Sequence, residues 1–371
     1  MLGASPILEE MMVGIINITK GCNLACKYCY AGNYKALSEQ RKLVDAELRR
    51  NMPSIFCFID KLSEMQNGSV NILFHGGEPT LASPDLLRSI AEYARTIDND
   101  AKISIQTNGT LISDQLVDLF RDYHITVGIS LDGPPEINDK NRIFANGNGT
   151  ADLIIRNIKK LKAESIPVGV LITFTNENID HVADIYSMCR EIDVGFSFNP
   201  LFIPETEVGV EPLDKMKYAK AICDLFDIWI NDQDSTIGVR PFERILMGFV
   251  DQEIGLPVCS YSQNCAEQIL TIDVDGQVYP CNRLAGMEEF SYGRVDEIKL
   301  QERIEKCSFS KRWDYLKDRD CLGCNVSKFC YGGCPSHSHS ENGTIFCKDD
   351  MCESHIVILN HIYNYIQGFK K

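Results

Sequence analysis

The stretch Gly21-Cys22-Asn23-Leu24-Ala25-Cys26-Lys27-Tyr28-Cys29-Tyr30 comes directly after a run of apolar residues at positions 13–19. It sets three cysteines at C-x3-C-x2-C spacing, and three thiolates can hold three irons of a cubane iron–sulfur cluster. Such a cluster normally has four cysteine ligands, so one iron would stay open to a small molecule. A zinc knot is the alternative, but zinc sites usually close with four ligands. No fourth cysteine follows at a matching local spacing.

Strand-like and helix-like runs alternate around this motif. Apolar or β-rich runs occupy residues 13–19, 70–74, 102–106, 126–130, 168–174 and 195–199. Amphipathic helical patterns fill the intervals, at residues 43–62, 84–97, 112–124, 150–164 and 181–192. Six such alternations predict an α/β fold with a parallel sheet wrapped by helices. Because these crossovers are right-handed, we expect a partial (β/α)6 version of the eight-fold barrel, with functional residues just after the strands.

Three polar or glycine-rich segments stand where this barrel would place its site. His75-Gly76-Gly77-Glu78-Pro79-Thr80 ends the second strand, and Gln106-Thr107-Asn108-Gly109-Thr110 ends the third. Ser130-Leu131-Asp132-Gly133-Pro134 ends the fourth strand, with Asn141-Arg142 shortly beyond it. Two adjacent glycines let the backbone approach a ligand closely.

These segments and the three cysteines, with Tyr28 before the third, resemble the radical S-adenosylmethionine (SAM) superfamily and especially its peptide-modifying members. The resemblance implies that SAM binds the open iron, takes one electron and gives a carbon radical that abstracts hydrogen from a substrate. It also implies that the cysteines Cys22, Cys26 and Cys29 hold the cluster. The residues expected to hold SAM are Tyr28, Gly76, Gly77, Glu78, Pro79, Asn108, Ser130 and Arg142. A surface salt bridge is an equally open reading of Arg142.

The pattern of the sequence changes after about residue 210. A bridging amphipathic helix is expected at residues 213–232, and from Cys259 onward short segments are rich in cysteine, glycine and aromatic residues. No long apolar pattern typical of a buried core returns until a terminal helix near residues 355–369. We therefore expect this region to need metal clusters to stabilise its fold. We therefore expect a barrel over residues 1–210, a helical bridge over 211–255 and a cysteine-rich domain over 256–371.

The C-terminal cysteines read Cys265-x10-Gly276-x4-Cys281, then Cys321-x2-Cys324-x5-Cys330-x3-Cys334, then Cys347 and Cys352. This arrangement resembles the SPASM domain, which holds two auxiliary [4Fe–4S] clusters. The resemblance implies one cluster on Cys259, Cys265, Cys281 and Cys334, and another on Cys321, Cys324, Cys330 and Cys352. It favours Cys352 over Cys347 as the last ligand. Zinc ribbons are the alternative, and Cys57, Cys189, Cys223 and Cys307 are expected to be ordinary core thiols.

Composition limits the partners. The formal net charge of −15 over 371 residues argues against a nucleic-acid partner. The N-terminal stretch lacks a signal-peptide pattern, and no apolar run is long enough to span a membrane. Sixteen cysteines in a reducing cytosol are metal ligands more often than disulfides. We expect a cytoplasmic enzyme with SAM, three [4Fe–4S] clusters and a reductant such as flavodoxin or ferredoxin.

Two peptide oxidations compete. Anaerobic sulfatase-maturating enzymes turn Cys or Ser into formylglycine, and the family places an aspartate as general base directly after the cysteine of Val278-Tyr279-Pro280-Cys281. Here Asn282-Arg283 follows, and an amide cannot accept that proton. The segment at residues 279–295 resembles maturases that crosslink ribosomally made precursor peptides through thioether or carbon–carbon bonds. We therefore expect crosslinking first and formylglycine formation second, with a non-catalytic electron-transfer or zinc-binding scaffold as the remaining alternative.

The catalytic residue stays open. His75, Glu267, Asp273 and Tyr28 are candidates by position only, and each is more often structural than catalytic. Little sequence precedes Cys22, so recognition of a leader peptide is expected to be intrinsic or supplied by a separate leader-binding protein.

Overall fold

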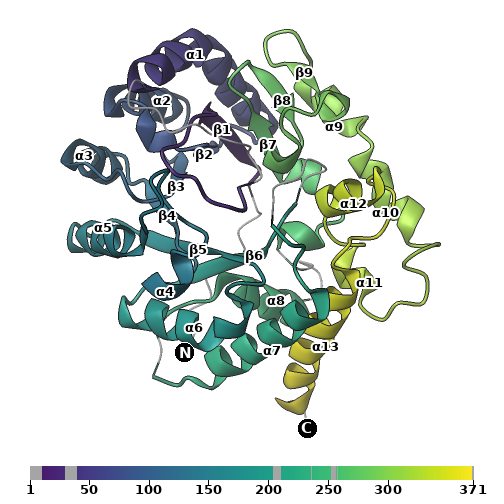
Figure 1. Cartoon of the computed structure of the whole chain (residues 1–371). Coiled ribbons are helices and arrows are strands. Elements are labelled where there is room, and N and C mark those ends of the chain that lie inside the picture. Colours follow the sequence, from purple (N-terminus) through teal and green to yellow (C-terminus); the bar gives the residue numbers. More distant parts are fainter. Residues whose placement is uncertain are drawn as a thin grey trace.

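The computed structural model describes residues 11–29, 40–203, 210–234, 236–251, 256 and 258–369. Its strands form one sheet in the order β6-β5-β4-β3-β2-β1-β7-β8-β9 (Figure 1). The first six are β1 (Val13–Thr19), β2 (Asn71–Gly76), β3 (Lys102–Thr107), β4 (Thr126–Ser130), β5 (Val168–Phe174) and β6 (Phe196–Pro200). They pair in parallel with their neighbours in chain order. The described sheet does not close, so the predicted partial barrel is confirmed.

The helices between these strands bury one face each. They are α1 (Gln40–Met65), α2 (Pro84–Ile97), α3 (Asp114–Asp122), α4 (Pro135–Asn138), α5 (Ala151–Ala163) and α6 (Val182–Glu191). Helix α2 turns Leu86, Leu87 and Ile90 inward, and full burial of each such side chain contributes roughly 1.5–3 kcal/mol. Ser113 caps α3 by accepting the Leu116 N–H, which fixes the helix start. The short helix α4 was not expected from the sequence.

The cysteine-rich region continues the barrel sheet, which the sequence analysis did not foresee. Strand β7 (Ile269–Ile272) runs parallel to β1, and β8 (Gln277–Tyr279) and β9 (Gly293–Arg294) follow in antiparallel pairing. Just after β7, the buried Asp273 carboxylate accepts hydrogen bonds from Asn17 of β1 at 3.3 Å and from Lys20 at 2.9 Å. These contacts fix the C-terminal region beside the loop that begins at Cys22.

The remaining α-helices connect the barrel to the cysteine-rich C-terminal region. They are α7 (Lys215–Asn231), α8 (Arg240–Val250), α9 (Leu300–Glu305), α10 (Phe309–Leu316), α11 (Ser327–Cys330), α12 (Pro335–Asn342) and α13 (Cys352–Phe369). Figure 1 shows α9–α13 on the side of the molecule away from α3 and α5. Phe226 of α7 meets Tyr365 of α13 edge-on at 5.3 Å between ring centres. None of the described helices is both long and apolar enough to cross a membrane.

Candidate functional site

A cavity of about 230 Å³ lies at the carboxyl ends of the barrel strands. It collects all three cysteines of the first motif. Six of the eight residues expected to hold SAM also line it, namely Tyr28, Gly76, Gly77, Asn108, Ser130 and Arg142. Phe202 and Arg283, from later in the chain, complete part of its wall. The carboxyl ends of parallel strands lie at the same edge of the sheet. The segments that follow these strands, although distant in sequence, therefore meet at one cavity.

The glycine pair is needed for a contact between two backbones. A Cβ atom on Gly77 would lie 2.1 Å from the carbonyl oxygen of Gly21. Gly77 N–H donates to Thr19 O at 2.7 Å, and Glu78 N–H donates to Gly21 O at 2.8 Å. The segment is thus bonded directly to the residues before Cys22. This adds a structural reason for the glycines to the expected approach of a ligand.

Glu78 and Pro79 lie behind the cavity wall. The Glu78 carboxylate is fully buried and accepts from the Thr80 hydroxyl at 2.6 Å, the Thr107 hydroxyl at 2.6 Å and the Asn108 N–H at 2.7 Å. Burial raises the pKa of Glu78, although these hydrogen bonds oppose the rise. In this structure the carboxylate therefore joins the ends of β2 and β3.

Tyr28, Asp132 and Arg142 form a buried polar chain beside the cysteines. The Tyr28 hydroxyl donates to Asp132 at 2.5 Å and accepts from Arg142 Nη1 at 2.7 Å. Arg142 is only 7% exposed, so its reading as a surface salt bridge is wrong. Its Nε has no hydrogen-bond partner among the described residues. A guanidinium in this position, with a donor still to satisfy, suits the recognition of an anionic group.

The three cavity thiols suit an iron cluster. Burial and the neighbouring Glu78 raise the pKa of Cys22 to about 12, and burial raises the pKa of Cys26 as well. Without a metal such thiols stay protonated at neutral pH, whereas iron binds them as thiolates. Asn108 Nδ2 lies 3.8 Å from the Cys22 sulfur. The donor set, with three thiols on one cavity, therefore fits the SAM-binding cluster.

The eight thiols expected to hold the auxiliary clusters perturb one another within two sets of four. Burial and the thiols of Cys259, Cys281 and Cys334 together raise the pKa of Cys265. In the second group, burial and the thiols of Cys352 and Cys324 raise the pKa of Cys321. Burial, Asp349 and the thiols of Cys352 and Cys321 raise the pKa of Cys330. Each thiol thus lies close enough to its own group to perturb it electrostatically.

The carbonyl oxygen of Cys347 accepts from Arg312 Nη2 at 2.9 Å. In the described ranges, no group of three or more His, Cys, Asp or Glu side chains has the spacing of a single metal ion. Thiolates around a cubane each bind a different iron, so they stand further apart.

Arg312 stabilises the loop of the second cysteine motif. The sequence analysis did not predict this role. This buried side chain donates to the carbonyl oxygens of Ile345, Tyr331, Gly332, Gly333 and Cys347. The loop that joins Cys330 to Cys334 has three successive residues with positive φ, which turns its carbonyls to one side. An arginine within a helix gives no sequence signal of such a role.

Of the four residues proposed by position as catalytic, two line the cavity and two do not. His75 and Tyr28 are in its wall, while Glu267 and Asp273 are not. His75 Nδ1 accepts from Gly76 N–H at 2.7 Å and faces the Asn282 amide nitrogen at 3.3 Å. Burial lowers the pKa of His75 to about 4. The ring is therefore neutral at pH 7, with its proton on Nε2.

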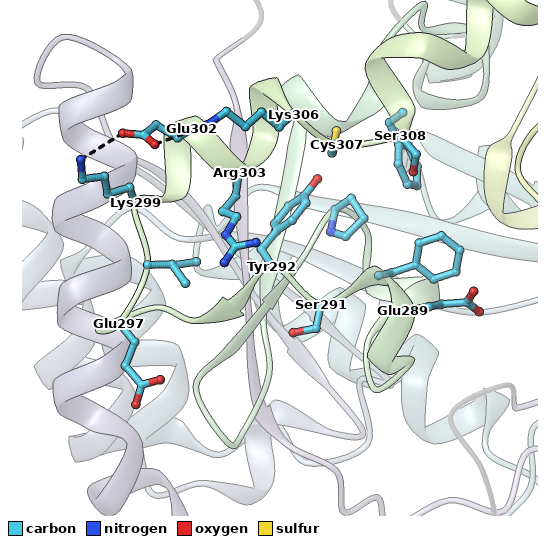
Figure 2. A pocket seen from close by; sticks show the side chains of 14 residues that line it. Glu289, Ser291, Tyr292, Glu297, Lys299, Glu302, Arg303, Lys306, Cys307 and Ser308 are labelled. Atoms are coloured by element: carbon cyan, nitrogen blue, oxygen red, sulfur yellow. Dashed lines mark ion pairs between the residues drawn. The ribbon is translucent and has the colours of Figure 1, made fainter.

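A larger cavity of about 500 Å³ lies in the C-terminal region (Figure 2). Its wall includes the Glu302 carboxylate of α9, which pairs with Lys299 and Lys306. It contains neither the three motif cysteines nor the expected SAM residues. The chemistry therefore belongs to the smaller cavity.

Comparisons with known proteins agree with this placement. Residues 16–189 match the family model of the Radical SAM superfamily. The chain is 27% identical over 356 residues to a cysteine-type anaerobic sulfatase-maturating enzyme of Clostridium perfringens, covering 91% of this chain and 92% of the relative. It is 28% identical over 342 residues to a serine-type enzyme of Klebsiella aerogenes, covering 89% and 81% respectively.

Solved structures show the same fold. Native anSMEcpe with bound AdoMet and Cp18Cys peptide gives a TM-score of 0.80 at 23% identity, over 96% of this chain and 98% of that one. Streptococcus suis SuiB bound to precursor peptide SuiA gives 0.63 at 17% identity, over 93% and 76%. Both likenesses support the predicted partial barrel followed by a cysteine-rich C-terminal region.

Proposed function

We propose that this chain is a radical SAM enzyme that oxidises a Cys or Ser side chain of a peptide or protein to formylglycine, as its similarity over nine tenths of its length to anaerobic sulfatase-maturating enzymes suggests. The observation that carries the proposal is this similarity to both cysteine-type and serine-type relatives. The sequence analysis ranked peptide crosslinking first. The relatives favour its second reading instead.

We propose that Cys22, Cys26 and Cys29 hold the first [4Fe–4S] cluster and that SAM occupies the adjoining cavity. Bound there, SAM and the cluster supply a carbon radical that removes one hydrogen atom from the substrate. The Arg142 guanidinium, oriented by Tyr28 and Asp132, would bind the SAM carboxylate through its remaining donor. Asn108 and Ser130 would bind other polar groups of SAM. The backbone of Gly76 and Gly77, which lines this cavity, would border SAM.

Oxidation of the substrate requires a second electron to leave after the hydrogen atom, together with a proton. For serine this loss gives the aldehyde directly, whereas for cysteine it gives a thioaldehyde that water hydrolyses to formylglycine with release of hydrogen sulfide. We propose that two auxiliary [4Fe–4S] clusters, on the two C-terminal cysteine groups, receive that electron. The mutual perturbation of the thiols within each group supports these ligand sets. On this proposal the chain divides near residues 210 and 255 into barrel, helical bridge and cluster domain. A flavodoxin or ferredoxin would supply the first electron.

Crosslinking of a ribosomally made peptide is the second candidate, and Asn282 favours it. This amide stands where the sulfatase-maturating family is expected to have its aspartate base, and it cannot accept a proton. His75, its neighbour, already has Nδ1 engaged by Gly76. A separate leader-binding protein would be a further partner for this activity.

The test is an anaerobic reaction of the reconstituted enzyme with SAM, a reductant and the Cp18Cys peptide, followed by mass spectrometry. Formylglycine formation gives an aldehyde that reacts with a hydrazine. Crosslinking instead gives loss of two hydrogens, with fragmentation blocked between two residues. Parallel co-expression with short peptides encoded beside the gene covers that second outcome. A protein that binds iron but never cleaves SAM would contradict both candidates.

A further inference from the structure

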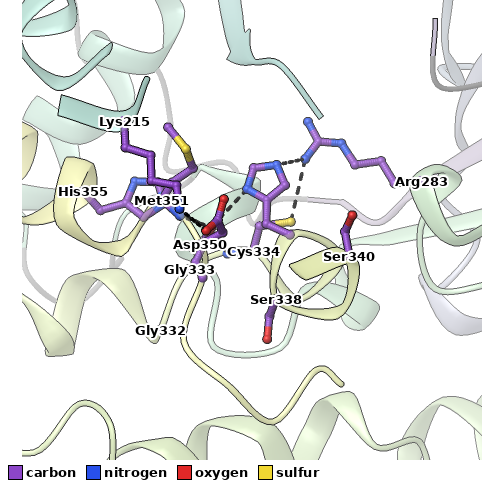
Figure 3. A network of polar contacts seen from close by, with 12 residues as sticks. Lys215, Arg283, Gly332, Gly333, Cys334, Ser338, Ser340, Asp350, Met351 and His355 are labelled. Atoms are coloured by element: carbon purple, nitrogen blue, oxygen red, sulfur yellow. Dashed lines mark hydrogen bonds and ion pairs between the residues drawn. The ribbon is translucent and has the colours of Figure 1, made fainter. Parts of the chain in front are cut away.

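Arg283 touches both the cavity and one auxiliary cysteine group. Its side chain lines the cavity that holds Cys22, Cys26 and Cys29. Its Nη1 lies 3.8 Å from the sulfur of Cys334, as the dashed line in Figure 3 shows. The guanidinium carbon stands 5.0 Å from the centre of the Phe202 ring, another cavity wall residue. This cation therefore lies between the cavity proposed for SAM and a proposed cluster ligand.

A chain of hydrogen bonds fixes the guanidinium in this place. Arg283 Nη1 donates to His337 Nε2 at 2.6 Å, so the His337 proton is on Nδ1, which lies 3.1 Å from Asp349 Oδ1. The other Asp349 oxygen accepts the Cys334 backbone N–H at 2.6 Å. The His337 ring also stacks on Phe202 at 5.7 Å. Arg283 is thus anchored to the same loop that presents Cys334.

Asp349 brings a negative charge to this region, and its environment offsets that charge. His355 Nε2 lies 3.1 Å from Asp349 Oδ2, and the Met351 N–H donates to Oδ1 at 2.8 Å. The Asp349 carboxylate accepts a hydrogen bond from the Cys334 backbone N–H, whereas the Arg283 guanidinium lies against the Cys334 sulfur. A positive charge and an N–H donor at a ligand sulfur both stabilise the more negative, reduced cluster.

We propose that Arg283 is a positioning residue that raises the reduction potential of the auxiliary cluster bound through Cys334, making that cluster the acceptor of the substrate's second electron. The inference rests on the proposed role of Cys334 as a cluster ligand. In the step concerned, the substrate radical loses one electron and one proton, and the cluster gains the electron. A flavodoxin- or ferredoxin-type protein then reoxidises the cluster.

The experiment is a redox titration of the reconstituted holoenzyme, followed by electron paramagnetic resonance, with no peptide needed. In Arg283→Gln, one auxiliary cluster should bind its electron about tenfold less tightly, ~59 mV for a one-electron couple. The other two potentials should stay unchanged. Arg283→Lys keeps the charge and should recover most of the shift. Arg303→Gln removes the same charge from the exposed face of α9 and serves as the matched control.

Unchanged potentials in Arg283→Gln would overturn the inference. A shift that Arg303→Gln reproduces would also overturn it, because net charge alone would then be responsible. Iron content separates this failure from failure of the proposed function. About twelve irons per chain keeps the three-cluster proposal standing, whereas about four would remove the Cys334 cluster and the inference with it.

Discussion

On the proposed function, Asn282 stands where a general base is expected. Its amide faces His75 Nδ1 at 3.3 Å, and neither group presents a ready base to the substrate. Asn282→Asp would add a carboxylate that accepts a proton directly or orients His75 with Nε2 free. We expect this variant to raise the aldehyde yield from the Cp18Cys peptide about a hundredfold, the lower end of the 10²–10⁴ range for general bases.

Hydrazine-labelled peptide, quantified by mass spectrometry, measures that yield. Asn282→Ser, which is also uncharged, is the control. An aldehyde yield that falls in Asn282→Asp would show that the amide itself takes part in catalysis.

The pH dependence of turnover tests the state of His75. Burial lowers its pKa to about 4, so the ring loses its proton below the working range and stays neutral from about pH 5 upward. We expect kcat/KM between pH 5.5 and 8 to have the same shape in the wild type and in His75→Gln. An inflection near pH 6.5 that disappears in His75→Gln would mean that the imidazole titrates in the free enzyme.

At the scale of elements, the contact between the end of β2 and the cysteine loop is the most demanding feature of the barrel. A Cβ on Gly77 would meet the Gly21 carbonyl at 2.1 Å, and backbone cannot give way as a flexible side chain can. Gly77→Ala should therefore displace the loop and lose the first cluster, leaving about two thirds of the iron. In the control Gly169→Ala, the nearest atom to the new Cβ is 3.7 Å away. Full iron content and SAM binding in Gly77→Ala would contradict this account.

The loop between α11 and α12 depends on Arg312 in the same way. Lysine has three donors and no planar fork, so Arg312→Lys leaves buried carbonyls unpaired. We expect the free energy of unfolding to fall by on the order of 3 kcal/mol. This fall would appear as a lower unfolding midpoint of the anaerobic holoenzyme and as early loss of the auxiliary clusters. The exposed Arg319→Lys should shift the midpoint little. Equal midpoints for the two variants would contradict the role of Arg312.

At the scale of the whole molecule, the sequence predicted what local patterns can encode. All six barrel strands appear within one or two residues of their expected positions, because apolar runs and end-of-strand polar segments are local signals. The pairing of β7 with β1 was missed because short strands amid cysteines carry little periodicity. Burial of Arg142 and the five carbonyls on Arg312 could not be predicted either, since both arise from contacts between segments far apart in sequence.

The ranking of functions shows the same limit. The sequence analysis identified Asn282 as a departure from the expected base, but one residue could not outweigh similarity along nine tenths of the chain. Its geometry beside His75, which the sequence did not predict, now defines what the site lacks and where a base could be added.

The most direct measurement follows hydrogen from the substrate to SAM. The enzyme would be reacted anaerobically with SAM, a reductant and Cp18Cys peptide deuterated at Cβ of its target cysteine. We predict deuterium in the SAM-derived 5′-deoxyadenosine and an aldehyde at that residue. Unlabelled 5′-deoxyadenosine and an unmodified peptide, with SAM cleaved at the same rate whether or not peptide is present, would contradict oxidation of a cysteine side chain in this cavity.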